Sequence, residues 1–217
     1  MKTFLSIGAG PGIGLATAER FAREGFRVVL AARSAARLDE MAAELRAKGL
    51  ECDVAVVDAS DADGIRTLVS SVASRHDAVD VLHYNAFSLR KATIDEQPAE
   101  SFIPDLAVNI GGALVAAQAV LPLMEAHGGG TVLLTGGGLG LNPSPDFVSV
   151  SIGKAGLRAM ALALFEPLKA RGVHLGIINV NAYVTPGSPD AIGVADAFWA
   201  MHTADVADWR AEAPYPT

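Results

Sequence analysis

Short apolar runs alternate along the chain with longer segments in which apolar residues recur about every 3.6 positions. The short runs are apolar at successive positions, which is typical of strands buried on both faces of a parallel sheet. They occupy residues Thr3–Ile7, 27–30, 53–57, 79–83, 131–134 and 173–180. The longer segments predict helices over 12–24, 34–48, 61–76, 98–126 and 146–170. Strands and helices that alternate in this way predict βαβ units.

Residues that begin and end helices agree with this pattern. Ser34 and Asp61 precede two of the predicted helices as candidate N-caps, and a glycine follows four of them, at Gly25, Gly49, Gly128 and Gly172. No change in composition marks a linker, so we expect one domain over residues 1–217. The predicted fold class is α/β, with a doubly wound parallel sheet that binds ligands at the carboxyl ends of its strands.

Composition and charge narrow the class of protein. Of 217 residues, 51% are apolar and 19% are charged, which excludes a disordered chain. The net charge of −7 opposes broad contact with nucleic acid or an anionic membrane. Cys52 is the only cysteine and the histidines show no ligand spacing, so we predict no metal site and expect surface or capping histidines. With no targeting signal in the sequence, we expect a cytoplasmic protein.

The first predicted strand runs into a glycine-rich segment, Gly8-Ala9-Gly10-Pro11-Gly12-Ile13-Gly14, at the start of the first predicted helix. Glycine lets a ligand approach the backbone closely, and a helix N-terminus offers unpaired N–H groups to a pyrophosphate. The segment therefore predicts dinucleotide binding at Gly8, Gly10, Gly12, Ile13 and Gly14. A glycine-rich turn without a ligand is the alternative.

At these residues the chain resembles the short-chain dehydrogenase/reductase family, whose motif TGxxxGxG is met with Ile7 in place of the Thr. Further matches follow in order: Asp58 after the third strand, residues 84–87 (Tyr-Asn-Ala-Phe) for the family's NNAG, then Asn109 and Lys154 within helices. The first and last of residues 84–87 depart from NNAG. The resemblance implies a Rossmann fold and an NAD(P)-dependent oxidoreductase. It also implies a homodimer or homotetramer that pairs through the apolar helices around 113–123 and 155–164.

The same resemblance implies roles for individual residues in cofactor binding. Asp58 would contact the adenine amino group, and Asn85 and Ala86 would support the loop beneath the cofactor. Lys154 would bind the ribose hydroxyls beside the nicotinamide, and Thr185 would bind the nicotinamide amide. For Asp58, a solvated carboxylate at a strand end is the alternative.

The end of the second strand favours NADP over NAD. Ala32 stands where family members that use NAD keep an acidic residue for the ribose hydroxyls, and Arg33 follows it. A guanidinium pairs with a phosphate through two hydrogen bonds, which suits the 2′-phosphate of NADP. Residues 1–50 also carry an excess of basic side chains. We therefore predict NADP as the cofactor, with a solvated arginine at the helix start as the alternative.

The catalytic residues implied by the resemblance are only partly present. The family uses an Asn, a Ser, a Tyr and a Lys, and Asn109 and Lys154 match two of them. The Tyr position, four residues before Lys154, is Val150, and the Ser position is Gly137. Valine and glycine side chains carry no proton donor, so we predict slow or undetectable carbonyl reduction. Asn109 could instead satisfy a helix kink.

Four other hydroxyl groups are candidates to replace the missing acid. Ser149 and Ser151 flank Val150, but on a helix they point about 100° to either side of it. Thr135 lies two residues before Gly137, on the same face of its strand. The phenol of Tyr183 could reach a substrate, although we favour an apolar anchor for the returning chain.

These patterns predict an NADP(H)-binding oxidoreductase of this family with an incomplete tetrad, whose substrate the sequence does not name. One alternative is a catalytically inactive cofactor-binding protein that acts as a nucleotide sensor or as a partner in an oligomer. Another is hydride chemistry on an activated double bond, which needs no acid from the protein.

Overall fold

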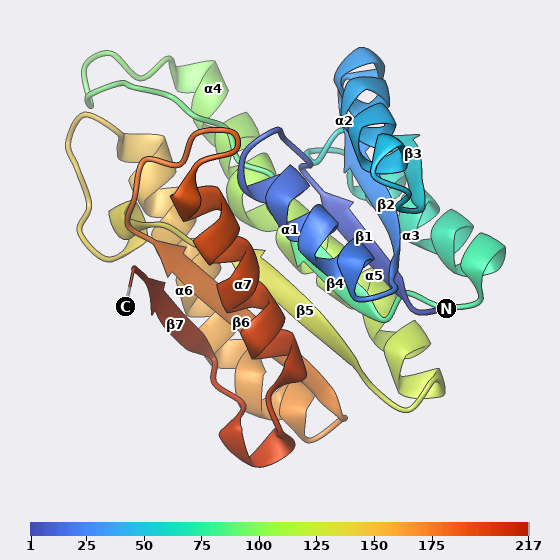
Figure 1. Cartoon of the computed structure of the whole chain (residues 1–217). Helices are drawn as coiled ribbons and strands as arrows, with labels where there is room; N and C mark the ends of the chain where they lie inside the picture. Colours follow the sequence, from blue (N-terminus) through green and yellow to red (C-terminus); the bar gives the residue numbers. More distant parts are fainter. Residues whose placement is uncertain (217) are drawn as a thin grey trace.

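Seven parallel strands form one sheet in a computed structural model of the chain, which describes residues 1–216 (Figure 1). Their order across the sheet is β3-β2-β1-β4-β5-β6-β7, so the order reverses between β1 and β4. In a doubly wound sheet that reversal opens a crevice at the carboxyl ends of the two strands. The strands are β1 Thr3–Ile7, β2 Arg27–Ala32, β3 Cys52–Val56, β4 Val81–Tyr84, β5 Gly130–Thr135, β6 Val173–Val180 and β7 Glu212–Tyr215.

Helices cover both faces of the sheet. One face packs against α1 Ile13–Arg23, α2 Ala35–Ala47 and α7 Pro189–Thr203, with α1 and α7 side by side (Figure 1). The other face packs against α3 Ala62–His76, α5 Gly112–Ala126 and α6 Val148–Lys169, with the short α4 Ala99–Leu106 against α6. The result is the single-domain, three-layer α/β architecture that the alternating pattern predicts.

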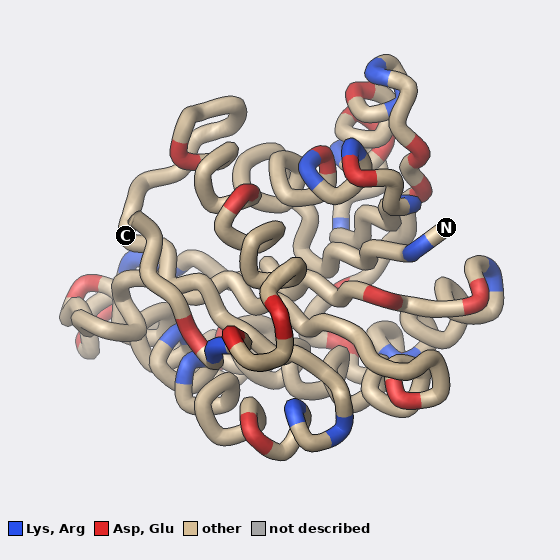
Figure 2. Tube along the Cα trace, turned by 60° about the horizontal axis from the view of Figure 1, so that its bottom comes forward, with Lys and Arg blue, Asp and Glu red and all other residues tan. Residues whose placement is uncertain are grey.

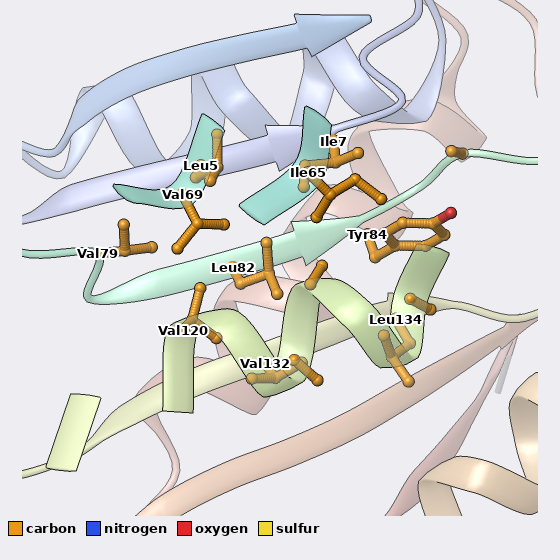
Figure 3. Close-up of a cluster of buried hydrophobic side chains, with 14 of the residues drawn as sticks. Leu5, Ile7, Ile65, Val69, Val79, Leu82, Tyr84, Val120, Val132 and Leu134 are labelled. Atoms are coloured by element: carbon orange, nitrogen blue, oxygen red, sulfur yellow. The ribbon is translucent and has the colours of Figure 1, made fainter. Parts of the chain in front are cut away.

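The core on the α3–α5 side shows how the strand sequence produces these layers. Leu5, Leu82 and Val132, from β1, β4 and β5, lie on one face of the sheet and meet Val120 of α5 (Figure 3). On β1, Phe4 points instead to the opposite core, because successive side chains of a strand alternate between faces. Both faces of the central strands are buried, so their sequences are largely apolar, and the polar Ser6 and His83 are buried with them.

Most sequence predictions for the elements are confirmed. Ser34 and Asp61 accept hydrogen bonds from the backbone N–H groups of Arg37 and Asp63, as N-caps do. The four glycines expected after helices all have positive φ, between 74° and 85°. The tail around 209–215 forms the edge strand β7.

Two helix predictions were wrong in detail. The predicted helix over 98–126 is α4 and α5 joined by a π-helical turn, η1, over Ala107–Gly111. Helix α7 was not predicted, although Ser188 caps it and Pro189 occupies its first turn. Its buried residues recur at helical spacing, but apolar residues such as Ile192 and Trp199 lie outside that stripe, so the helical period is weak in the sequence.

The expectation of surface or capping histidines was wrong for His83 and His174, which are both buried. His83 lies on β4 between the hydroxyls of Ser6 and Thr135, at 3.2 and 3.0 Å from its ring nitrogens. Burial lowers the pKa of His83 to about 3, so the ring is neutral at physiological pH. Both flanking hydroxyls are far from His83 in sequence, and sequence spacing therefore gave no sign of them.

Positive and negative residues are mixed over the molecule. Lys and Arg positions mix with Asp and Glu positions over residues 1–216 and do not gather on one side (Figure 2).

Two helical stretches, Ala99–Ala126 and Val148–Lys169, are long and apolar enough to cross a membrane by length and composition alone. In the fold both stretches pack in the helical layer over the sheet, the position of core helices.

Candidate active site

The turn between β1 and α1 is held tightly against the end of β4. Gly8 has φ +84°, and its N–H donates to the carbonyl of Ala31 at 2.8 Å. A Cβ atom on Gly8 would lie 2.2 Å from the backbone nitrogen of Ala86, so no larger residue fits. The Nδ2 of Asn85 donates to the Gly8 carbonyl at 2.9 Å. Residues 85 and 86 therefore fix the shape of the glycine-rich turn.

The first turn of α1 suits an anionic ligand. Its N-cap, Gly12, provides no side-chain cap, and the first turn carries no acidic residue. The first N–H groups of the helix are thus left for another acceptor. A Cβ atom on Gly10 would meet no atom within 4 Å, so the turn is open on that side. A diphosphate fits this cradle, with Ile13 at its far end.

A cavity of about 330 Å³ opens beside the turn, at the ends of β1, β2 and β3. Arg33, Arg37 and Asp58 are the charged residues on its wall. Asp58 Oδ1 accepts hydrogen bonds from the backbone N–H and hydroxyl of Ser60, at 2.8 and 2.7 Å. These bonds hold the pKa of Asp58 below its usual range, so it is a carboxylate at neutral pH. The cavity combines two guanidinium groups with one carboxylate.

Arg37 was missed by the sequence analysis. It lies one turn into α2, and its backbone N–H donates to the hydroxyl of Ser34. The helix therefore starts in a way that brings Arg37 to the same cavity as Arg33. The available signal was a second arginine in the first turn after the predicted N-cap, Ser34.

A second cavity, of about 590 Å³, lies at the carboxyl ends of β5 and β6. Lys154 is its buried ionisable group among residues 1–216, and Val150 lies one helical turn before it. Gly137 faces the Lys154 stem: a Cβ atom there would lie 3.7 Å from Cγ, Cδ and Cε of the lysine. The remaining wall is largely apolar, from residues that include Leu89, Leu139, Val180 and Val184.

Two contacts hold the ammonium group of Lys154. Its Nζ donates to the carbonyl of Thr135 at 2.7 Å and lies 5.3 Å from the centre of the Phe87 ring. The side chain is 8% exposed, and burial lowers its pKa to about 8. The hydroxyl of the same Thr135 contacts His83, so it points toward the core and not toward the lysine.

Asn109 lies behind the second cavity and not on its wall. It occupies the π-helical turn, where its Oδ1 accepts from the N–H of Ser88 at 2.7 Å. The preceding carbonyl, of Val108, accepts from the Tyr84 hydroxyl at 2.6 Å. A π-helical turn leaves backbone groups to be satisfied from outside, and it is frequent at functional sites. Asn109 therefore secures the loop that follows β4.

The remaining candidate residues differ in whether they line the second cavity. Tyr183 lines the second cavity but is 92% exposed, so the favoured interpretation as an apolar anchor was wrong. The hydroxyls of Ser149 and Ser151 are buried, and Ser151 bonds to Ser144. Thr185 is exposed at the start of the connection to α7, outside the walls of both cavities. The structure thus leaves Tyr183 as the one phenol at the cavity mouth among residues 1–216.

Comparison with known proteins identifies the family. Residues 2–191 match the family described as short chain dehydrogenase. The chain belongs to the short-chain dehydrogenase family. The seven-stranded fold agrees, because the family is built on a parallel sheet with a dinucleotide site at the same edge.

Relatives span different lengths. The "Oxidoreductase asL5" of Sarocladium schorii is 27% identical over 192 residues, which cover 88% of this chain and 76% of that protein. The "Probable oxidoreductase EphD" of Mycobacterium tuberculosis is 32% identical over 192 residues, but these cover 85% of this chain and 32% of EphD. The chain therefore spans about a third of EphD. A metagenomic short-chain oxidoreductase in complex with NADP superimposes with a TM-score of 0.91 and 25% identity, over 100% of this chain and 97% of that one.

Proposed function

We propose that this protein is an NADP(H)-binding oxidoreductase of the short-chain dehydrogenase family whose catalytic tetrad is incomplete. The observation that carries the proposal is the pair of guanidinium groups, Arg33 and Arg37, in the cavity at the end of β2. Neither forms an ion pair within residues 1–216, so both can pair with a phosphate on the adenosine ribose. The short-chain oxidoreductase with NADP, described above, supports the same cofactor.

In this proposal, different residues of the first cavity bind different parts of the cofactor. Arg33 and Arg37 would hold the 2′-phosphate, and Asp58 would accept a hydrogen bond from the adenine amino group. The turn at Gly10 and Gly12 would hold the diphosphate through backbone N–H groups. An uncharged Ala32, where an acidic side chain would repel the 2′-phosphate, favours NADP over NAD.

The second cavity supplies few groups for catalysis. NADPH, when bound, supplies a hydride. The oxygen of a carbonyl substrate then needs a hydrogen-bond or proton donor, which Val150 and Gly137 lack. Lys154 is the remaining buried cation, and its contact with the Thr135 carbonyl uses one of its three donors. We therefore propose that simple ketones and aldehydes are reduced slowly, with Lys154 and Asn109 as the retained members of the tetrad.

Binding and turnover measured together test this proposal. Calorimetric titration of the purified protein should give tighter binding for NADPH than for NADH. Oxidation of bound NADPH should be slow with a panel of ketones and aldehydes, and faster with activated double bonds that need no acid from the protein. Equal affinities for the two cofactors would reject NADP specificity. Tight NADPH binding without oxidation by either panel would identify the inactive cofactor-binding protein instead.

We also propose that two copies pair through α5 and α6. Leu114 on α5 and Leu162 on α6 are exposed although large and apolar, at 38% and 42%. Ile152, one turn from the cavity on α6, is exposed as well. Apolar residues on neighbouring helices of one face are a suitable surface for a second copy of the chain.

A further inference from the structure

One aromatic side chain stands between the two cavities of the proposed cofactor site. Phe87 follows β4 after Asn85 and Ala86, at the position where the family's NNAG motif has glycine. Its ring contributes to the walls of both cavities and is 48% exposed. Asn85 is the other residue common to the two walls. These two side chains therefore mark the boundary that any ligand occupying both cavities has to cross.

The ring also covers the lysine that would receive the far half of the ligand. The centre of the Phe87 ring lies 5.3 Å from Lys154 Nζ, within the range of a cation–π contact. The same ammonium group also donates a hydrogen bond to the Thr135 carbonyl at 2.7 Å. Ribose hydroxyls that bind Lys154 would therefore have to approach the ammonium group beside the aromatic ring.

The first cavity has no such obstruction. Its charged residues, Arg33, Arg37 and Asp58, lie beyond Ala86 on the side of β2 and β3. Gly10 leaves the turn open next to it. A ligand limited to the adenosine half can thus bind without displacing the ring.

We infer that Phe87 divides the dinucleotide site, so that a 2′-phosphorylated adenosine ligand binds as well as the whole dinucleotide does. The inference rests on the proposed function, because it assigns the two cavities to the two halves of NADP(H). Moving the ring away from Lys154 costs the cation–π contact, and this cost reduces the affinity for the dinucleotide alone. Phe87 is therefore a specificity-determining residue that occupies the Lys154 ammonium group needed by the nicotinamide half of the ligand.

Titration of four forms of the full chain tests the inference. Wild type, Phe87→Gly, Phe87→Ala and the matched control Leu89→Gly are each titrated with NADPH and with adenosine 2′,5′-bisphosphate. Leu89 suits the control because it is exposed and lines the second cavity alone. Wild type should bind the two ligands with similar dissociation constants. Each Phe87 variant should bind NADPH about tenfold more tightly, with adenosine 2′,5′-bisphosphate unchanged.

Three results would count against the inference, and they can be told apart. Wild type that binds NADPH far more tightly than adenosine 2′,5′-bisphosphate, with no gain in either Phe87 variant, overturns the division of the site. An equal gain in Leu89→Gly shows that loop flexibility, not the ring, controls affinity. Binding of neither ligand by any form removes the proposed NADP site, and the inference with it. The Ala variant separates loss of the ring from the added backbone freedom of glycine.

Discussion

At the scale of single residues, we propose that Arg33 and Arg37 decide which cofactor the first cavity selects. Both line it, and both are free of ion pairs within residues 1–216. A hydrogen bond to a charged group contributes about 1.5–3 kcal/mol. Such hydrogen bonds would give specificity because NADP carries the 2′-phosphate and NAD lacks it.

Removing either guanidinium should therefore reduce the preference for NADPH. We expect Arg33→Ala and Arg37→Ala each to narrow the difference in binding free energy between NADPH and NADH by about 1.5–3 kcal/mol. Calorimetric titration measures both affinities. NADH binding serves as the internal control, since it should hardly change. A proportional loss for both cofactors would mean that these residues support the fold of the cavity and not the 2′-phosphate.

Val150 and Gly137 set the chemistry of the second cavity. The space for larger side chains exists, because a Cβ atom on Gly137 would make ordinary contacts of 3.7 Å with the Lys154 stem. Val150 lines a cavity of about 590 Å³. We expect the double variant Val150→Tyr with Gly137→Ser to raise NADPH-dependent carbonyl reduction by at least about a hundredfold.

A matched double variant is the control for that experiment. Val150→Phe has a similar bulk to tyrosine but no hydroxyl, so with Gly137→Ser it should give no comparable gain. Initial rates of NADPH oxidation with a carbonyl panel provide the comparison. If wild type already reduces ketones rapidly and Tyr183→Phe leaves that rate intact, an acid other than these residues operates.

At the scale of elements, the β1–α1 turn combines a structural glycine with one that we propose binds the ligand. Gly8 has φ +84° and its Cβ position lies against the Ala86 backbone, whereas the Cβ position of Gly10 is open. Two glycines separated by one residue should therefore respond to substitution in opposite ways. Their difference comes from the neighbouring strand end and not from the turn sequence.

We expect Gly8→Ala to lower the free energy of unfolding by more than about 3 kcal/mol, because backbone strain and a clash with β4 add together. The matched control is Gly25→Ala, which shares φ +84° but meets no atom within 4 Å. It should cost about 1–2 kcal/mol from strain alone. Urea unfolding measures both variants, and equal losses would show that the contact with Ala86 contributes nothing.

Gly10→Val should leave stability close to wild type and weaken NADPH binding by at least about a hundredfold. The valine side chain would stand in the open side of the turn, where the diphosphate approaches. The same urea unfolding, combined with calorimetric titration, separates the two effects. Retained affinity would move the diphosphate away from this turn.

At the scale of the whole molecule, we propose that the exposed apolar residues of α5 and α6 form the interface between copies of the chain. We expect the protein to sediment as a dimer or tetramer, and Leu162→Arg to shift it toward the monomer, because a buried guanidinium without a partner opposes association. Val206→Arg is the control, since Val206 is also exposed and apolar but lies in the 3₁₀ turn η3, Val206–Asp208. A wild-type monomer in sedimentation velocity would refute the proposed pairing.

The buried histidines determine how stability depends on pH. Burial lowers the pKa of His83 to about 3 and that of His202 to about 4, below the ordinary value of 6.5. The unfolded chain therefore binds more protons than the folded chain once the pH falls below about 6.5. Stability decreases as the pH falls from there toward the folded-state values, and His83 alone contributes a loss of about 2 kcal/mol by about pH 5.

Urea unfolding between about pH 8 and about pH 5 tests this dependence. His83→Leu should flatten the profile, even if the loss of its contacts with Ser6 and Thr135 lowers stability at every pH. His127→Ala should leave the slope as in wild type, because that residue is exposed near the end of α5. An unchanged slope in His83→Leu would mean that His83 is not the group that resists protonation.

Much of the fold follows from local sequence. The strands, the caps at Ser34 and Asp61 and the glycines after the helices are settled within a few residues of each position, so they were predictable. A short continuous apolar run is typical of a strand that is buried on both faces of a parallel sheet. Helix α7 was missed because apolar residues such as Ile192 and Trp199 lie outside the stripe that packs on α1 and obscure its period in the sequence.

Features that depend on where distant segments meet were decided only by the tertiary structure. In the sequence, Lys154 and Phe87 are two separate motif positions. Their contact depends on how α6 packs beside the end of β4. His83 became a core residue, and Tyr183 an exposed one, for the same reason. The sequence by itself determined the elements, their order and the glycine-rich turn, through short-range backbone and side-chain preferences. Packing across the sheet determined which side chains share a cavity, because that is set by the directions of residues far apart in the chain.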